Sequence, residues 1–389
     1  MKRARILQFP GLIGLLSSLA GIASAASVDF NREVRPILTD NCFECHGPDP
    51  AQRKAKLRLD TPEGLFGKRK VTIVVPGDVE RSELYRRLTG ADGLEQMPPP
   101  EAHRRPSADQ IDLLRRWILE GARYTEHWAF VAPERSVVPV GANGIPAANP
   151  IDGFVRSGLV AQGLKPSEAA DRATLIRRLS LDLLGLPPSP EDVVLFAGDS
   201  REDAYERLVE RFLSSPRYGE QMAWSWMEAA RYADTDGFQS DSTRHMWRWR
   251  DWVVEAFNRN LPYDQFTLEQ LAGDLLPNPT PDQILATGFN RNHRYDKGSG
   301  TIQEESIFEN AADRLETTAT VWLGLTMNCA RCHDHKFDPI SSREYYAMLG
   351  FFDRVPENGQ AILFNSHPRV KTPTLEQDEH LAALDRKVA

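Results

Sequence analysis

The sequence predicts a mostly α-helical fold built from a small domain and a larger one. Apolar residues recur at helical spacing along most of the chain, and helix-capping patterns precede several of these stretches. No pair of alternating segments around a tight turn indicates a hairpin. Residues 126–150 are rich in proline and glycine, which indicates an extended linker between the two groups of helices.

The first 25 residues are predicted to form a secretory signal peptide. Basic residues near the start precede a short apolar run at 11–16, and Ala23-Ser-Ala25 is typical of a cleavage site, so the mature chain is expected to begin near Ala26. The apolar run is too short for an ordinary membrane span. We therefore expect an exported protein, periplasmic or at the cell surface, with no integral membrane span beyond the signal peptide.

All four cysteines lie in two copies of one pattern, Cys42-Phe-Glu-Cys45-His46 and Cys329-Ala-Arg-Cys332-His333. The spacing C-x-x-C-H is the attachment signature of c-type haem, in which both thiols form thioethers and the histidine ligates the iron. The sequence thus predicts two covalently attached c-type haems, with His46 and His333 as iron ligands. A zinc site usually has its second ligand pair within about 20 residues, and a disulfide does not explain the histidine.

The N-terminal domain, residues 26–125, is predicted to begin and end with a helix. The first helix is expected directly before Cys42, where apolar residues fall at helical spacing, with Asn31 as its cap. The last begins at the capping box Ser107-Ala-Asp-Gln110 and is expected to stop near Gly121. Three leucines between these helices are expected to line a haem: Leu57, Leu59 and Leu65.

Met97 is the predicted sixth ligand of the first iron. It lies between the haem motif and the last helix, and the three prolines that follow restrict the backbone. A thioether is a soft ligand that raises the reduction potential when paired with histidine. His103, on a polar stretch, is the competing candidate, and a core-filling role is the alternative for Met97.

Residues 151–357 are predicted to form an all-α domain that carries the second motif. One helix is expected along an apolar stripe that ends at Gly185, and another over residues 205–212. Helix-start signals at Ser189 and Thr280 predict two more. A long apolar stripe from Ile307 to Leu325 is expected to run into Cys329, and Ser341 to Glu344 is a capping box for one more helix. The tail, residues 358–389, is polar and weakly helical, and either ends a short chain or is truncated.

The sixth ligand of the second iron is not predicted by the sequence. Four residues are candidates, and for each of them a structural role is the alternative: His245, Met246, His293 and Met348. His335 is too close to His333 to reach the opposite face of the same iron, so we expect a hydrogen-bonding or interhaem role for it. An open sixth position is the remaining alternative, and it would suit small-molecule or peroxide chemistry.

Two further segments have competing interpretations. The acidic residues at 234–241 match part of a calcium loop, but Tyr232 and Thr243 occupy ligand positions, which favours a hydrogen-bonded turn. Residues 244–252 alternate arginine with tryptophan. We expect helix packing, salt bridges or contact with haem propionates there, with sugar stacking as a weaker alternative.

Residues across both domains carry a family resemblance. Around the first motif these are Pro36-Ile-Leu38, Cys42 to Pro48, Leu57-Arg-Leu-Asp60, Pro76-Gly77, Ser82-Glu-Leu84, Met97-Pro-Pro99 and Trp117-Ile118. This part resembles the planctomycete-type cytochrome c domain, which implies a class I-like cytochrome fold with haem ligated by His46 and Met97.

The larger domain carries its own set of matching stretches. They are Leu179 to Pro188, Tyr232 to Gly237, Trp249 to Val253, Gln270 to Asp274, and Thr318 to Pro339. This part resembles the helical domain of uncharacterised function that follows the cytochrome domain in the same planctomycete proteins, often classed there as a cytochrome. The resemblance implies a larger all-α haem domain and supplies no activity for it.

Charge and motifs together favour one function over two others. The net charge of −8 argues against nucleic-acid binding. We expect an exported dihaem cytochrome that transfers electrons with a redox partner protein. A haem-dependent oxidoreductase with catalysis at the second haem is the first alternative, and a binding module with polysaccharide contact is the second. The coordination of the second iron distinguishes the first two functions: a six-coordinate iron favours electron transfer, and an open sixth position favours catalysis.

Overall fold

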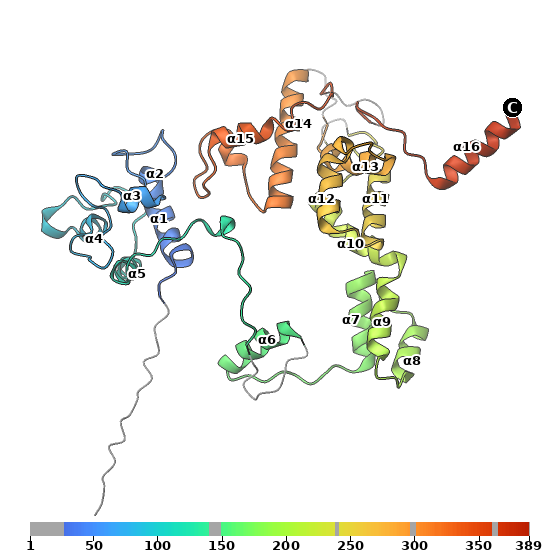
Figure 1. Ribbon diagram of the computed structural model, residues 1–389, viewed down its shortest axis with the longest axis horizontal. Coiled ribbons are helices and arrows are strands. Elements are labelled where there is room, and N and C mark those ends of the chain that lie inside the picture. The colour runs from blue at the N-terminus through green and yellow to red at the C-terminus, as the bar shows by residue number, and fades with distance from the viewer. Residues whose placement is uncertain (1–26, 140–148, 238–240, 296–300, 360–364, 389) are drawn as a thin grey trace, which may run out of the picture. The chain divides into compact units, whose positions relative to one another are not determined.

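The computed structural model describes residues 27–139, 149–237, 241–295, 301–359 and 365–388 (Figure 1). Over these ranges the regular structure consists of helices, labelled α1 to α16, with short 3₁₀ and π turns and no strand. The mostly α fold that the sequence predicts is therefore confirmed. The chain divides into two compact units, which meet in the sequence at Val131 and Ala132.

The N-terminal unit contains five helices and three short turns in its described part. In chain order they are η1 (Phe30–Val34), α1 (Arg35–Asn41), α2 (Phe43–His46), α3 (Pro62–Phe66), α4 (Glu83–Thr89), η2 (Ala91–Gly93), α5 (Ala108–Leu119) and η3 (Trp128–Phe130). The predicted capping box at Ser107 and Gln110 begins α5 and is confirmed. The predicted cap Asn31 is wrong. Asp29 precedes the first helical turn with an extended backbone and accepts from the N–H of Arg32, whereas Asn31 already lies inside that turn.

The core of the N-terminal unit joins its first helical turn, η1, to α5. The ring of Phe30 lies 5.5 Å from that of Trp117 on α5 and 4.6 Å from that of Tyr124. Leu59 and Leu65, two of the leucines predicted to line a haem, are buried in the same core, and Cys42 packs against it. Because each fully buried apolar side chain contributes about 2 kcal/mol, this core holds the haem motif on a stable support.

The C-terminal unit contains the remaining helices. In chain order they are α6 (Pro150–Ala161), α7 (Arg172–Leu184), α8 (Pro190–Gly198), α9 (Ala204–Leu213), α10 (Pro216–Ala229), α11 (Trp247–Asn258), α12 (Tyr263–Ala272), η4 (Gly273–Leu275), α13 (Pro281–Ala286), η5 (Thr287–Arg291), α14 (Gln303–Thr318), η6 (Ala319–Leu323), η7 (Asn328–Arg331), α15 (Ser342–Leu349) and α16 (Leu375–Val388). The predicted starts at Ser189, Thr280 and Ser341 are confirmed. Gly185 ends α7 with a φ of 70°, as predicted.

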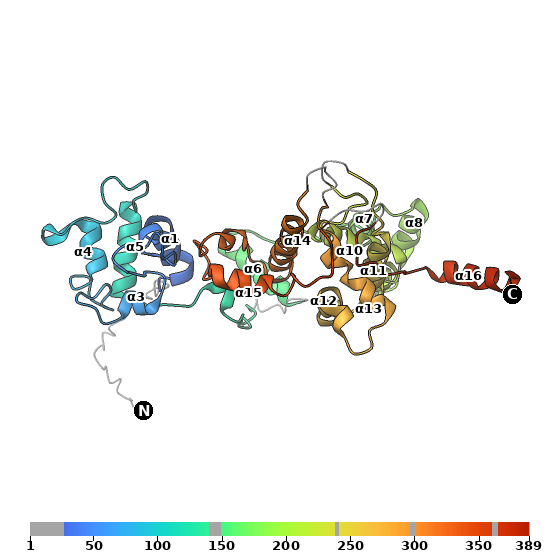
Figure 2. The ribbon, with the colours of Figure 1, turned by 90° about the horizontal axis from the view of Figure 1, so that it is seen from above.

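Three hydrophobic clusters are formed by the described residues of the C-terminal unit. Helices α7 to α9 enclose one around Ile176, helices α10 to α13 enclose a second around Trp249 and Trp252, and α14 and α15 enclose a third around Leu315. Figures 1 and 2 show α10, α11, α12 and α13 gathered together. The turn η6 contacts two of these clusters: Ala319 belongs to the third, whereas Trp322 packs against the second, with its ring 4.8 Å from that of Trp226. The second haem motif therefore follows a segment that is packed on both sides.

The long stripe before the second motif is shorter than predicted. Helix α14 passes into the π turn η6, and Gly324 ends it with a φ of 64°. Glycine adopts this left-handed conformation without strain, so the helix stops there and does not run into Cys329. A separate 3₁₀ turn, η7, contains Cys329 instead, and Cys332 directly follows this turn.

Parts of the predicted organisation fall outside the described residues. These are the signal peptide, residues 140–148 of the linker, and residues 360–364 and 389 of the tail. The described part of the linker contains the short turn η3. Among the described residues, no helix combines the length and the apolar character needed to cross a membrane.

Candidate functional site

The first C-x-x-C-H motif forms a single helical turn. The carbonyl oxygen of Cys42 accepts hydrogen bonds from the N–H of Cys45 at 3.1 Å and from that of His46 at 2.8 Å. Gly47 ends the turn, and a Cβ there would lie 2.2 Å from the carbonyl oxygen of Phe43, so the close approach requires glycine. Both thiols and the imidazole are thereby brought onto one short segment.

Burial differs among the three side chains of the first motif. Cys45 is exposed, whereas Cys42 is half-buried against the core, and burial together with the neighbouring Cys45 raises the pKa of the Cys42 thiol to about 12. Burial lowers the pKa of His46, and a hydrogen bond with the backbone of Lys54 acts against that shift. Nδ1 of His46 is buried and has no hydrogen-bond partner in the structure. The imidazole is therefore favoured in its neutral form, which is the form that ligates metals.

Met97 lies in the loop between η2 and α5. Its N–H donates to the carbonyl oxygen of Arg87 at 3.0 Å, its side chain is half-buried, and Pro98 behind it is buried. His103, the competing candidate, is exposed. The backbone of the Met97 loop is thus held in place by α4, and iron ligation by Met97 stays a prediction.

The second motif repeats the backbone geometry of the first. The carbonyl oxygen of Cys329 accepts from the N–H of Cys332 at 3.3 Å and from that of His333 at 3.4 Å. The side chains of Cys329, Cys332 and His333 are all exposed. Nδ1 of His333 lies 2.8 Å from the carbonyl oxygen of Asp334, which can only accept. Nδ1 therefore carries the proton and leaves the Nε2 lone pair free for a metal.

Helix α15 contacts the second motif at its middle residue and directly after its last residue. The N–H of Ser342 donates to the carboxylate of Asp334 at 2.9 Å, and the hydroxyl of Tyr346 donates to the carbonyl oxygen of Arg331 at 3.0 Å. His335 is buried, and its Nδ1 accepts from the N–H groups of Phe337 and Asp338 at 3.3 and 3.0 Å. The hydrogen-bonding role predicted for His335 is confirmed, and it stabilises the turn after the motif.

A polar cavity of about 230 Å³ lies beside the second motif. It is lined by His293, Arg294, Glu309, Asn310, Ala312, Asp313, Glu316, Asn328 and Arg331. Two of its carboxylates form ion pairs, Glu309 with Arg331 and Asp313 with Arg231. The third, Glu316, accepts a hydrogen bond from the hydroxyl of Tyr345 at 3.4 Å. The pKa of Glu316 is raised, mainly by burial and to a smaller extent by the charge of Asp313. The turn that carries Cys329 and Cys332 thus forms one wall of a charged cavity.

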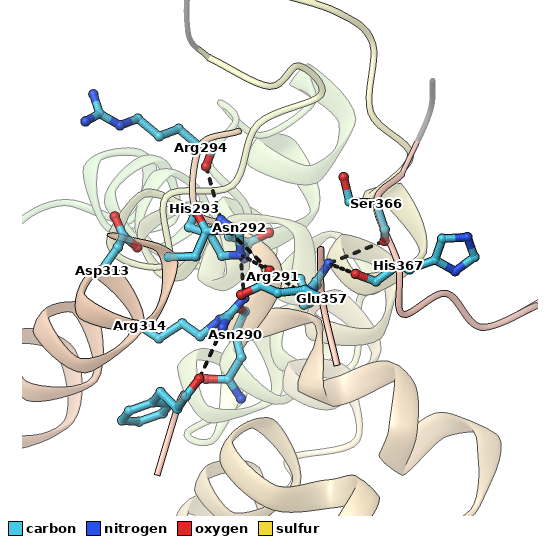
Figure 3. Close-up of polar contacts among 12 residues, drawn as sticks. Asn290, Arg291, Asn292, His293, Arg294, Asp313, Arg314, Glu357, Ser366 and His367 are labelled. Carbon is cyan, nitrogen blue, oxygen red and sulfur yellow. Dashed lines mark hydrogen bonds and ion pairs between the residues drawn. The ribbon is translucent and has the colours of Figure 1, made fainter. Parts of the chain in front are cut away.

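A buried charged network lies next to this cavity (Figure 3). Glu357 forms an ion pair with Arg314 at 2.7 Å and accepts from Arg291 at 3.2 Å and from Asn310 at 3.3 Å. Arg314 also donates to the carbonyl oxygens of Asn290 and Phe352. The network joins η5, α14 and the segment after α15. No local pattern in the sequence predicts this network. The sequence feature that could have indicated it is Arg314, a charged residue next to Leu315 on the apolar face of α14.

His293 belongs to the same network. The guanidinium of Arg314 lies 2.8 Å from its Nε2, and since arginine can only donate, Nε2 accepts while Nδ1 donates to the carbonyl oxygen of Arg294. Burial first, then the charges of Arg314 and Arg291, hold the pKa of His293 well below its usual value. The lone pair that would ligate iron is therefore engaged by Arg314.

The other three candidates for the second iron have contacts of their own. Met246 and Met348 pack against hydrophobic clusters. His245 is exposed, and its backbone exchanges two hydrogen bonds with the side chain of Asn365. Each of these residues has a structural role in the fold. None of them is identified as the sixth ligand of the second iron.

The acidic segment at 234–241 forms a hydrogen-bonded turn in its described part. The N–H of Gly237 donates to the carboxylate of Asp241 at 2.8 Å, and that of Arg244 donates to the carbonyl oxygen of Asp234 at 2.8 Å. Within the described ranges, no cluster of acidic, histidine and cysteine side chains is arranged to hold a metal ion. The turn interpretation is confirmed over these residues.

The segment rich in arginine and tryptophan packs as a helix. Trp249 and Trp252 on α11 are buried, and the indole N–H of Trp249 donates to the carbonyl oxygen of Ala286 at 3.0 Å. Arg250 forms an ion pair with Asp251. Helix packing and salt bridges, two of the roles predicted for this segment, are confirmed.

Two family models match the chain. Residues 42–101 match the model described as Planctomycete cytochrome C, so the small helical unit contains a cytochrome c family domain. Residues 150–357, more than half of the chain, match PSCyt2, described as a protein of unknown function (DUF1549). The protein belongs to this family, and the order of the two domains is the one that the sequence indicated. No curated protein and no solved structure gives a significant match.

Proposed function

We propose that the protein is an exported dihaem c-type cytochrome that transfers electrons with a redox partner protein. One observation carries the proposal: both motifs form the same hydrogen-bonded turn. In each, the carbonyl oxygen of the first cysteine accepts from the N–H groups of the second cysteine and of the histidine. A turn of this kind places two thiols and one imidazole where a single haem can react with the first two and be ligated by the third.

The residues present at the two motifs fit covalently attached haem. At the first, burial favours neutral His46, whose Nδ1 has no hydrogen-bond partner in the structure. At the second, the carbonyl oxygen of Asp334 fixes the tautomer of His333 and leaves Nε2 free. When bound, each haem supplies a one-electron couple at its iron. Cys42, Cys45, Cys329 and Cys332 anchor the two groups, and we infer that Met97 completes the first site.

The exposure of the second motif supports electron exchange with a partner protein. Cys329, Cys332 and His333 are exposed, so a haem attached to them has an edge at the surface. Helix α15 fixes the turn through Ser342 and Tyr346, which limits reorganisation around the site when its charge changes. A fixed ligand and an accessible edge are what electron transfer requires of the protein.

Catalysis at the second haem is the alternative, and the polar cavity beside Asn328 and Arg331 is the observation that favours it. Its volume of about 230 Å³ lies below the roughly 300 Å³ at which pockets for drug-sized ligands begin. Only a small molecule fits such a space. Electron transfer remains the better supported function, because it needs nothing beyond the two motifs.

A reductive titration of the purified mature protein tests the proposed function. Absorbance and EPR spectra recorded during stepwise reduction and reoxidation should show two haems, each taking up one electron reversibly. Uptake of one electron or none per chain would overturn the proposal. Sequencing the N-terminus of the same sample tests export, because cleavage by a signal peptidase leaves a chain that begins near Ala26.

A further inference from the structure

Glu316 is the carboxyl group in the cavity without a cation partner. Glu309 is paired with Arg331, and Asp313 is paired with Arg231. The hydrogen bond that the structure gives to Glu316 comes from the hydroxyl of Tyr345 at 3.4 Å, and the side chain is half-buried. Among the described residues, no lysine or arginine forms an ion pair with Glu316. No salt bridge fixes its charge, although the positive charge of Arg331 acts to lower its pKa, so its protonation responds to changes of charge nearby.

The cavity connects Glu316 to the second motif. Asn328, which directly precedes Cys329, and Arg331, which lies between the two cysteines, line the same space as Glu316. A volume of about 230 Å³ is well above the roughly 10–15 Å³ of such space that one water needs, so the cavity is large enough for several waters. Waters that entered this space would give protons a route between solvent and the carboxyl group.

Other charged or titratable groups among the described residues also face the cavity. Helix α14 contributes Asp313 and Glu309, η7 contributes Arg331, α15 contributes the Tyr345 hydroxyl, and His293 and Arg294 follow η5. Both carboxylates are held in ion pairs. Arg314 engages His293, whose pKa lies well below its usual value, so it stays neutral. Glu316 is left as the carboxyl group without an ion pair, and burial first, then the charge of Asp313, raise its pKa against the lowering effect of the Tyr345 hydrogen bond.

We propose that Glu316 takes up the proton that accompanies reduction of the second haem. The inference rests on the proposed function, since it needs a haem at Cys329 and Cys332. A haem bound at this motif would take up one electron from the redox partner, and the carboxylate of Glu316 would take up one proton from solvent through the cavity. The added electron makes the site more negative, which raises the affinity of Glu316 for a proton. By reciprocity, protonation of Glu316 favours reduction.

The test uses the full chain carrying Cys42→Ser and Cys45→Ser, so that the second haem is the only one present. Its midpoint potential is measured from about pH 5 to about pH 8. The potential should fall as pH rises, approaching about 59 mV for each tenfold change in proton concentration, the value for one proton per electron. Glu316→Gln should abolish this dependence. Glu305→Gln, which removes a charge from the exposed first turn of the same helix, should leave it unchanged.

A second variant keeps the carboxyl group in place. The Tyr345 hydrogen bond lowers the pKa of Glu316, so Tyr345→Phe should move the pH-dependent range to higher pH. A potential that does not vary with pH in the parent, or a dependence that Glu316→Gln retains, overturns the inference. Haem staining of the parent distinguishes a failure of the proposed function from a failure of the role of Glu316. A parent without haem contradicts the proposed function, whereas a parent with haem and a flat potential contradicts the role of Glu316 alone.

Discussion

The guanidinium of Arg314 lies 2.7 Å from the carboxylate of Glu357, and both side chains are only 1% exposed. The pair joins α14 to the segment that follows α15, the helix that holds the second haem motif. Removing one partner from a buried ion pair leaves an uncompensated charge, which costs far more than the pair contributes as a whole. The integrity of the C-terminal unit therefore depends on both residues together.

Single substitutions in this pair should be strongly destabilising. Glu357→Leu and Arg314→Met should each lower the free energy of unfolding of the C-terminal unit by about 3–5 kcal/mol. The double variant should lose at least about 1 kcal/mol less than the sum, because it leaves neither charge alone. Urea unfolding followed by tryptophan fluorescence measures these values, with Glu305→Gln as an exposed control on α14. Strictly additive losses would contradict the coupling.

His293 should make stability depend on pH. Its pKa in the folded protein lies well below its usual value, whereas an unfolded histidine takes up a proton near pH 6.5. Below about pH 6.5 the unfolded state thus binds more protons, and the free energy of unfolding should fall by up to about 1.4 kcal/mol per pH unit. Above that pH the contribution is fully present. Denaturation at a series of pH values should show this loss in the wild type and a flatter curve in His293→Gln, and identical curves would exclude the effect.

Local features of the fold could be predicted from the sequence, and long-range ones could not. Ser107, Thr280 and Ser341 cap helices through residues three positions away, so the pattern lies within one window. The two haem motifs are equally local. Arg314 and Glu357 are far apart in the chain, and nothing in a single sequence indicates that they meet.

Two errors in helix boundaries have local causes. Asn31 and Asp29 are both good caps, and the fold selects Asp29 because it alone precedes the first helical turn. The apolar residue Leu325 suggested that the stripe before the second motif continues, but the left-handed Gly324 ends the helix first. In both cases backbone conformation decided between two sequence signals of similar strength.

Met97→Ala should change the first haem in a characteristic way. Loss of the thioether should abolish the sulfur-to-iron absorption band and lower the reduction potential, because the soft ligand that favours ferrous iron is gone. Absorbance and potentiometry of the full chain measure both effects, and His103→Ala is the matched control on the exposed competitor. If the spectrum of Met97→Ala matches the wild type, Met97 is not the ligand.

The second iron should have a weak or exchangeable sixth ligand. His293 is engaged by Arg314, and Met246 and Met348 pack against hydrophobic clusters. Carbon monoxide added to the reduced protein should therefore shift roughly half of the haem absorbance, since only one of the two irons is open. If neither haem responds, both irons are firmly six-coordinate, and catalysis at the second haem loses its support.

The number of covalent haems tests the central claim most directly. Intact-mass spectrometry of the mature protein after acid extraction should show two haem additions, because thioether bonds survive a treatment that releases non-covalent haem. Cys42→Ser with Cys45→Ser should remove one addition, and Cys329→Ser with Cys332→Ser should remove the other. A mature chain that carries one haem or none would contradict the dihaem cytochrome.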